Sequence, residues 1–398
     1  MMPELKDYIY LLHVYEVDKA GIKGDKMKKI LEFIKKETVL TVAWILAFAS
    51  AFIIHPNKNY LGYIDFKSLG TLWSLMVIMS GLKSKGFFEN IGKSLLSRTK
   101  YVWQLVVLLV VLPFVFSMFI TNDVALLTFV PFSIFILKMC NRENLLIIVI
   151  GLQTLAANLG SMLTPIGNPQ NLYLYGISNM SLMDFLALML PYSLLSLLML
   201  LISIVFIKGK NEIIVTDGLK NDEGSSKIQI QIYVYAILFI ISLLTVAKVI
   251  EFWWLVVIVL IACLVMDRHA LVDIDYALLF TFVGFFIFTG NLGNIDSVKN
   301  ALTSVVGGHE IITGIISSQF ISNVPAALLL SEFTKNLNGL IIGVNLGGLG
   351  TLIASMASLI SFKLLAHSYN ELKGKYLIVF TLLNIVFLVV LLALASFI

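Results

Sequence analysis

The chain has 398 residues, of which 59% are hydrophobic and only 13% charged, and its mean hydropathy is +0.95. Because a helix that faces water needs a polar side, this composition excludes an ordinary soluble domain. The net charge of +4 comes from basic residues that lie between the apolar runs rather than on one face. Such charges indicate membrane topology and give no sign of a nucleic-acid partner.

The apolar runs predict a chain that crosses the membrane many times. Residues 1–36 carry scattered lysines and no signal-peptide cleavage site, so we expect a cytoplasmic or interfacial segment. The later runs have about the 20-residue length that spans a bilayer. Two further stretches, 101–138 and 310–334, are interrupted in the middle by polar residues. The predicted crossings are 38–55, 64–82, 143–163, 183–207, 230–250, 252–267, 275–291, 338–362 and 376–397.

A polar linker at 208–229 divides the chain into a first half, 37–207, and a second half, 230–398. The linker is equally compatible with a hinge, a regulatory loop or simple slack. If both interrupted stretches return to the side they left, most Lys and Arg residues fall on one side of the membrane. Basic loops stay in the cytoplasm, so we expect a cell-membrane protein with its N-terminus inside and its C-terminus outside.

Three landmarks recur in both halves in the same order, and an odd number of predicted crossings separates the second landmark from its counterpart. The halves then have opposite orientations, as in transporters with inverted repeats. The sequence therefore predicts an all-α polytopic membrane protein with two inverted repeats, each containing a re-entrant hairpin and a broken transmembrane helix. The matching segments are Asp65 and Asp275, Ser117–Asp123 and Ser318–Val324, and Asn158–Thr164 and Asn345–Thr351.

The second interrupted stretch is too short to cross twice, because Ile311–Phe333 falls well below the roughly 40 residues that two crossings need. The first stretch is long enough for two crossings, so its re-entrant form rests on the repeat. A turn inside the membrane must line a cavity or bind a ligand, since lipid cannot satisfy its backbone. The amides that begin the returning helix suit an anion, and the carbonyls that end the entering helix suit a cation.

Asp123 is the most informative single residue. A carboxylate at the bilayer centre costs about 2.5–3.5 kcal/mol, so we expect a proton carrier or a cation ligand, with an N-cap of the returning helix as the alternative. Val324 holds the equivalent place in the second half. The prolines and glycines that follow Gly160, and the glycines from Gly347 onward, predict broken helices, and close helix packing is the alternative explanation.

Three segments carry a resemblance to a known family: Phe119–Pro131, Gly167–Asn171 and Ser322–Ala326. Over about residues 38–398 the sequence resembles the ion transporter superfamily, which includes divalent-anion/sodium symporters, citrate-transporter-like permeases and the ArsB/NhaD group. The resemblance implies that two opposed hairpin tips and two unwound helices hold substrate and sodium, and that the protein pairs as a homodimer. The positions that match are Ser117, Thr121, Asn122, Gly160, Ser318, Ser322, Asn323 and Gly347.

The sequence departs from the dicarboxylate symporters at the third tip residue, where Asp123 and Val324 replace threonine. An ionised Asp123 would repel a dianion by roughly 4 kcal/mol at 4 Å with an effective dielectric constant of 20. The first tip is more similar to the arsenite-permease branch, which implies proton coupling and a less charged substrate.

We therefore expect a secondary active transporter, not an enzyme, that moves a small anion by alternating access. The anion is a di- or tricarboxylate or an inorganic oxyanion such as arsenite; the coupling ion is sodium or a proton, and no cofactor is expected. The alternatives are a cation/proton antiporter centred on Asp123 and an ion channel. The expected substrate ligands are Thr121, Asn122, Asp123, Asn168, Ser322, Asn323 and Thr351. The expected ligands of the coupling ion, including sodium, are Ser117, Asn122, Asp123, Asn158, Gly160, Ser318, Asn323, Asn345 and Gly347.

Overall fold

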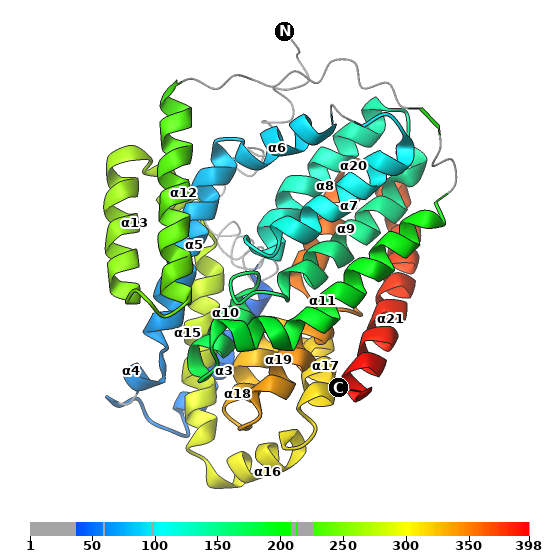
Figure 1. The fold of residues 1–398 in the computed structure, drawn as a ribbon. Helices are drawn as coiled ribbons and strands as arrows, with labels where there is room; N and C mark the ends of the chain where they lie inside the picture. The colour runs from blue at the N-terminus through cyan, green and yellow to red at the C-terminus, as the bar shows by residue number, and fades with distance from the viewer. Residues whose placement is uncertain (1–36, 59, 97–98, 208–211, 214–225, 398) are drawn as a thin grey trace, which may run out of the picture.

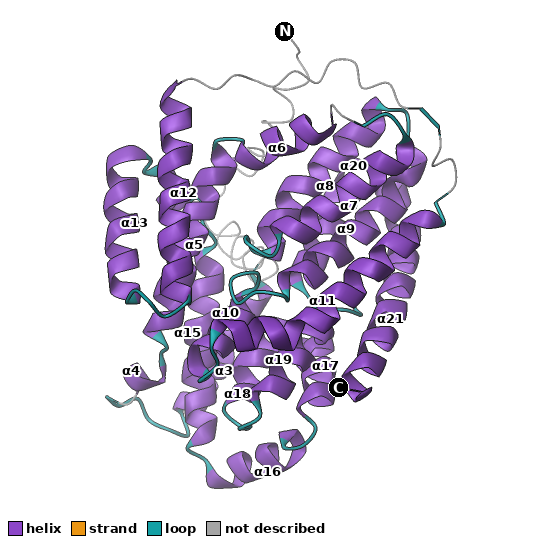
Figure 2. Cartoon of the chain, viewed as in Figure 1, coloured by secondary structure: helices purple, strands orange, loops and turns teal. Residues whose placement is uncertain are grey.

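A computed structural model describes residues 37–397 except 59, 97–98, 208–211 and 214–225. Over this part of the chain the regular structure is helical, apart from one isolated bridge between Tyr101 and Ile213 (Figure 2). The all-α prediction is therefore confirmed. The predicted N-terminal segment and most of the predicted linker lie outside the described residues.

The first half contains a set of long and short helices that are drawn from blue to green (Figure 1). They are α3 (Thr38–Ala51), α4 (Tyr60–Tyr63), α5 (Phe66–Ser84), α6 (Phe87–Leu96), α7 (Val102–Phe116), α8 (Asn122–Met139), α9 (Leu146–Ser161), α10 (Pro169–Ile177) and α11 (Leu182–Val205), with a 3-10 turn at Glu143–Leu145.

The second half begins with α12, which starts at Ser226 and so reaches further back than the predicted crossing at 230–250. The remaining helices are drawn from green to red in Figure 1. The helices of this half are α12 (Ser226–Val246), α13 (Phe252–Met266), α14 (His269–Val272), α15 (Tyr276–Gly293), α16 (Asp296–Val306), α17 (Glu310–Ile321), α18 (Asn323–Ser331), α19 (Leu337–Gly347), α20 (Met356–Ser368) and α21 (Lys373–Phe397), with a 3-10 turn at Asn370–Leu372.

The surface of the helices fits a lipid environment. Six described segments are long and apolar enough to cross a membrane, and α3, α7, α13, α17 and α19 are apolar but shorter. Large apolar side chains point outward on several of these helices; Phe48, Val265 and Phe320 are 62%, 80% and 77% exposed. Because lipid solvates such side chains and water does not, the chain is a multi-pass membrane protein.

Helices that hold the same place in the two halves have matching local structure and matching neighbours. Asp65 caps α5 by accepting from the backbone N–H of Ser68 at 3.1 Å, and Asp275 caps α15 by accepting from Leu278 at 3.1 Å. Helix α3 packs on α15 while α13 packs on α5, and α10 packs on α18 while α20 packs on α8. Helices α6 and α16 lie at opposite ends of the molecule (Figure 1). These matches support the predicted inverted repeats.

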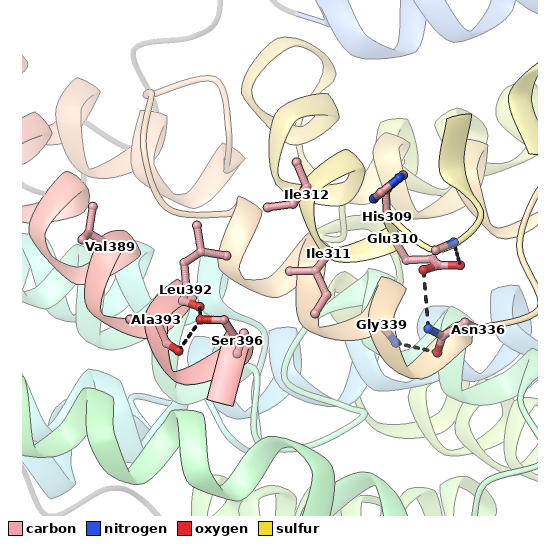
Figure 3. Close-up of a pocket in the computed structure, with 12 residues that line it drawn as sticks. His309, Glu310, Ile311, Ile312, Asn336, Gly339, Val389, Leu392, Ala393 and Ser396 are labelled. Atoms are coloured by element: carbon pink, nitrogen blue, oxygen red, sulfur yellow. Dashed lines mark hydrogen bonds between the residues drawn. The ribbon is translucent and has the colours of Figure 1, made fainter. Parts of the chain in front are cut away.

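The second hairpin, α17 and α18, is too short to span a bilayer. At 1.5 Å per residue its helices are about 18 Å and 14 Å long, against a hydrocarbon core of about 30 Å. Glu310 holds the base of the hairpin together, because it accepts hydrogen bonds from Gly308 N at 3.1 Å and from Asn336 Nδ2 at 3.4 Å (Figure 3). It also accepts from Thr334 Oγ1 at 2.8 Å. A pocket of about 570 Å³ between α17 and α21 opens beside this base, and no predicted site residue lines it.

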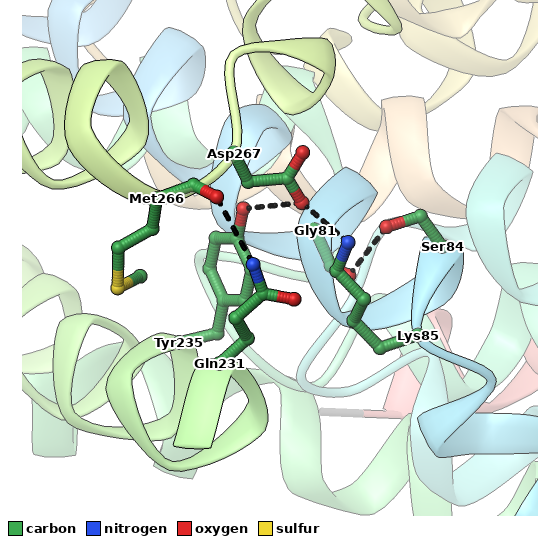
Figure 4. Close-up of polar contacts among 7 residues, drawn as sticks. All are labelled: Gly81, Ser84, Lys85, Gln231, Tyr235, Met266 and Asp267. Carbon is green, nitrogen blue, oxygen red and sulfur yellow. Dashed lines mark hydrogen bonds and ion pairs between the residues drawn. The ribbon is translucent and has the colours of Figure 1, made fainter. Parts of the chain in front are cut away.

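A polar cluster joins α5 to α12 and α13 at one end of the bundle (Figure 4). Lys85 forms an ion pair with Asp267 at 2.8 Å, and the Tyr235 hydroxyl donates to the same carboxylate at 3.2 Å. Gln231 donates from Nε2 to the carbonyl of Met266 at 3.0 Å. The Tyr235 ring lies where a side chain on Gly81 would be, at 2.1 Å from an added Cβ, so glycine is required for the two helices to approach.

Candidate functional site

Both predicted helix breaks are present, and each receives the tip of the hairpin from its own half. Helix α9 ends at Ser161 and α10 begins only at Pro169, a residue without an N–H to satisfy. At the first tip the backbone N–H of Asn122 donates to the carbonyl of Gly167 in this break at 3.2 Å. The tip helix is therefore fixed to the broken helix by its first amide.

The second half repeats this arrangement. Helix α19 ends at Gly347 and α20 begins at Met356. The backbone N–H of Asn323 donates to the carbonyl of Ala354 at 3.0 Å. Ser322, which joins α17 to α18, is 2% exposed and has a φ of 70°, a conformation that is rare for a residue with a side chain. Such a strained joint persists only where the surrounding structure holds it, and it is common at binding sites.

Close contacts between a serine and a glycine set the distance between each hairpin and each broken helix. A Cβ added to Gly160 would lie 2.6 Å from Ser117 Oγ and 2.1 Å from the carbonyl oxygen of Phe114. A Cβ added to Gly347 would lie 2.6 Å from Ser318 Oγ. The sequence prediction gave these serines and glycines as ligands of the coupling ion, and the structure brings one serine and one glycine together in each half.

Asn158 connects the first tip to the second broken helix. Its Oδ1 accepts from Asn122 Nδ2 at 2.9 Å and from Ser355 Oγ at 3.0 Å, and its Nδ2 donates to Ser358 Oγ at 3.1 Å. Asn158 is 6% exposed, so the three bonds are made away from the surface. Because Ser355 follows directly after Ala354, to which the second tip is bonded, Asn158 also brings the two tips close to each other.

Asn345 makes the reciprocal connection from the second half to the first broken helix. Its Oδ1 accepts from Asn168 Nδ2 at 3.2 Å, and its Nδ2 donates to Asn171 Oδ1 at 2.6 Å. Each asparagine therefore contacts the broken helix of the opposite half through two side chains. The two sets have the same spacing along the chain; they are Asn158, Asn168 and Asn171, and Asn345, Ser355 and Ser358.

Three other predicted substrate ligands lie at the ends of the helices rather than in the asparagine network. Thr351 is exposed, and its N–H and hydroxyl are bonded to Gln319 at 2.9 and 3.2 Å, so it supports the break rather than facing the asparagines. Thr121 is the N-cap of α8 and makes no capping bond through its side chain. Asp123 is half-buried in the first turn of α8, and its backbone N–H donates to Asn122 Oδ1 at 3.0 Å.

The sequence reasoning missed several polar side chains of this region. Asn171 ends the Gly167–Asn171 segment, but we did not expect it in the site. Extending the repeat by the spacing of Asn158 to Asn171 would have identified Ser358. Gln170 is 1% exposed, and its Nε2 has no hydrogen-bond partner among the described residues. The same holds for Oδ1 of Asn168, which is 2% exposed. Unpaired buried donors and acceptors cost free energy, so this donor and this acceptor are free to bind a ligand. The polar residues of this region that the sequence analysis did not predict as ligands are Gln170, Asn171, Gln319, Ser355 and Ser358.

The chemistry of the site is that of neutral amides, hydroxyls and backbone dipoles. The N-terminal ends of the tip helices carry a partial positive charge, and Asp123 supplies the only ionisable side chain among the predicted site residues. Such a site can bind and release a small polar solute. It offers no nucleophile and base pair among these residues.

Comparison with known proteins decides the family. The citrate transporter family model matches residues 30–338, most of the chain. The chain belongs to the citrate transporter family. Proteins of this family are transporters, not enzymes, and the resemblance inferred from the tips and from Gly167–Asn171 is confirmed.

Similar proteins occur in other organisms. An uncharacterized transporter of Methanocaldococcus jannaschii is 32% identical over 352 residues, covering 86% of this chain and 93% of that protein. The inner membrane protein YbiR of Escherichia coli is 32% identical over 320 residues, covering 79% and 84%. A shorter match, 34% identical over 155 residues, is to the silicon efflux transporter LSI3 of Oryza sativa subsp. japonica and covers 37% of this chain and 31% of that protein.

Proposed function

We propose that this citrate transporter family member is a secondary active transporter of a small anion, coupled to a proton or sodium gradient, that works by alternating access. The substrate class is a di- or tricarboxylate or an inorganic oxyanion such as arsenite. The proposed ligands are the tip residues Asn122, Ser322 and Asn323 together with Asn168, and Gln170 is added to them because its amide is buried and unpaired.

The observation that carries this proposal is the reciprocal asparagine network. Asn158 and Asn345 each bond the broken helix of the opposite half, and each tip is bonded to its own broken helix. Two hairpin tips and two breaks thus meet in one buried polar region of an apolar protein. Backbone of this kind is tolerated at membrane depth only where it lines a cavity or binds a solute.

No Lys or Arg side chain is among the predicted site residues. The positive charge that attracts an anion would therefore come from backbone dipoles. The N-terminal ends of α8 and α18 carry a partial positive charge, while their first amides, those of Asn122 and Asn323, already donate to carbonyls of the helix breaks. Asp123 disfavours a fully charged anion at short range, which favours a partly protonated carboxylate or a weak oxyacid.

A cation/proton antiporter centred on Asp123 is the second candidate. It is supported by the position of this carboxylate in the first turn of α8, beside the network residue Asn122. An ion channel is a third candidate from another class, which is distinguished by flux that does not saturate and needs no counter-ion.

Uptake by proteoliposomes tests the proposal. Citrate, succinate, sulfate and arsenite are offered with an imposed proton or sodium gradient, and we expect saturable, gradient-dependent uptake of at least one of them. Asn323→Ala removes a tip side chain and should abolish uptake, whereas Asn57→Ala, in an exposed loop, should leave it unchanged. Uptake of none of the four anions, or cation exchange without anion movement, would contradict anion transport.

We also propose the arrangement of the protein in the cell. Residues 37–207 and 230–398 form the two inverted repeats in the cell membrane, and the N-terminus is cytoplasmic and the C-terminus outside. The outward apolar side chains of α12 and α13, such as Tyr233 and Trp254, fit a scaffold surface that pairs two copies. Labelling of a cysteine introduced at residue 2 or 398 by a reagent that cannot cross the membrane tests the orientation. The mass of the purified protein in nanodiscs tests the homodimer.

A further inference from the structure

The two broken helices leave carbonyl oxygens inside the protein at their C-terminal ends. The last carbonyls of a helix have no partner in the helix itself and carry its partial negative charge. In a transporter with broken helices, such oxygens are the groups that hold a cation. The group that contacts these carbonyl oxygens therefore indicates whether a cation can bind there.

In the second half, a side-chain amide fills the carbonyl cluster that ends α19. Gln319 extends from α17, and its Nε2 donates to the carbonyls of Gly347 and Leu349, both at 2.9 Å, and to Ile315 at 3.2 Å. Its Oε1 accepts from the backbone N–H of Thr351 at 2.9 Å. The amide thus closes the end of the broken helix with donors of its own.

The loop is shaped around this amide. Gly350, between two of the bonded residues, has a φ of +116°. A Cβ at this position would lie 2.3 Å from Gln319 Oε1, so only glycine fits both the conformation and the space. Backbone and side chain are therefore matched to each other in this loop.

In the first half, a different residue from a different helix makes the equivalent contact. Asn171 of α10 is fully buried, and its Nδ2 points at the carbonyls of Ser161, Met162 and Thr164 at 3.3–3.4 Å. Its Oδ1 accepts from Asn345 Nδ2 at 2.6 Å. Both breaks are closed in this way, although Gln319 and Asn171 do not occupy equivalent positions of the two halves.

Neither amide can turn over to offer its oxygen to a cation. A flip of Gln319 would place Nε2 against the N–H of Thr351, and a flip of Asn171 would place Nδ2 against Nδ2 of Asn345. Each flip sets a donor against a donor, and it also leaves the carbonyl cluster without its hydrogen bonds. The two clusters therefore do not fit a sodium ion, because the oxygens it needs already accept N–H groups.

We propose that the side-chain amides of Gln319 and Asn171 take the place of a bound sodium ion at the two broken helices, so that this chain transports its substrate without Na⁺. That the chain transports a substrate rests on the proposed function. The closure of the clusters rests only on the contacts above.

Thermal unfolding of the purified protein tests the inference without a substrate. The midpoint Tm is compared in NaCl and in choline chloride at equal ionic strength and about pH 8. We expect equal values for the unchanged protein. Gln319→Glu keeps the shape but replaces the donor by an oxygen, so that carboxylate and carbonyls now face each other and require a cation. We expect its Tm to fall in choline and to rise in NaCl by about 3 °C at a Na⁺ concentration one hundred times the dissociation constant.

Gln231→Glu is the matched control, because Gln231 donates to a single carbonyl, that of Met266, at the end of α13. Its Tm should not distinguish Na⁺ from choline. Asn171→Asp is the second variant and should respond to Na⁺ as Gln319→Glu does.

A higher Tm of the unchanged protein in NaCl than in choline would overturn the inference, as would folded Gln319→Glu and Asn171→Asp proteins that both ignore Na⁺. If neither variant folds, the unchanged protein still decides. Failure of every anion in the proteoliposome assay would remove the proposed function but not this result.

Discussion

The contact between Gly160 and the first hairpin gives the sharpest prediction. In Gly160→Ala the new methyl carbon would lie 2.1 Å from the carbonyl oxygen of Phe114 and 2.6 Å from Ser117 Oγ. Ordinary contact distances are well above 3 Å, so α7 and α9 must separate by about 1 Å. The neighbouring atom at 2.1 Å is backbone, which cannot rotate away as a side chain can.

Gly151→Ala on the same helix is the matched control, because its nearest neighbour is the mobile end of Leu383 at 3.3 Å. Replacing glycine by alanine inside a helix is worth up to about 1 kcal/mol, which the control should retain. The same gain applies at Gly160, which lies on the same helix, so the difference between the two variants is the cost of overpacking, and Gly160→Ala should be about 1–3 kcal/mol less stable than Gly151→Ala.

Thermal unfolding of the two variants at one scan rate measures the difference, which we expect to be about 1–4 °C for a chain of this size. Proteoliposome uptake should be lost in Gly160→Ala, since the tip that carries Asn122 moves with α7. Equal stability and equal uptake in the two variants would refute the close contact and, with it, the fixed position of the first tip.

Three more predictions concern the site and its support. Asn158→Ala leaves the amide of Asn122 without its acceptor, so we expect a loss of about 1–3 kcal/mol in the free energy of unfolding, measured by denaturation, together with loss of uptake. Asp123→Asn should abolish the dependence of uptake on a proton gradient while substrate binding remains, and full gradient-driven uptake would rule out a proton-carrier role. Lys85→Met breaks the ion pair with Asp267 and should cost about 1–3 kcal/mol, less than for a fully buried pair, because 19% of the lysine side chain is exposed. Burial alone would raise the pKa of Asp267, but the hydrogen bond and charge of Lys85 lower it below its ordinary value, so this stabilisation is present above about pH 4 and the difference in Tm should shrink as the pH falls below that.

The parts of the fold that composition and spacing determine were predictable from the sequence. Apolar run length predicted apolar helices, six of which are long enough to cross a membrane among the described residues. The shortness of Ile311–Phe333 indicated a hairpin whose two helices are indeed too short to span. The prolines and glycines after Gly160, and the glycines from Gly347, marked both breaks. In each case one local rule, hydrogen-bond loss or length, is enough to decide the structure.

Side-chain partners across the two halves were harder to predict, because they depend on how the helices pack. Asn158 and Asn345 were assigned to an ion, whereas the structure bonds them to Asn122 and Ser355 and to Asn168 and Asn171. The amide of an asparagine is both donor and acceptor, so the sequence alone cannot tell whether it faces a ligand or another amide.

The difference between the two hairpins follows from the same property of amides. Gln319 occupies the place in the second hairpin that Met118 holds in the first, and only a side chain with a donor can close the carbonyls of Gly347 and Leu349. Where methionine stands, the donor has to come from elsewhere, and Asn171 supplies it from α10. A protein that ends two helices in its buried interior therefore has two solutions with different residues, because the requirement is a hydrogen-bond donor at the helix end rather than a particular amino acid.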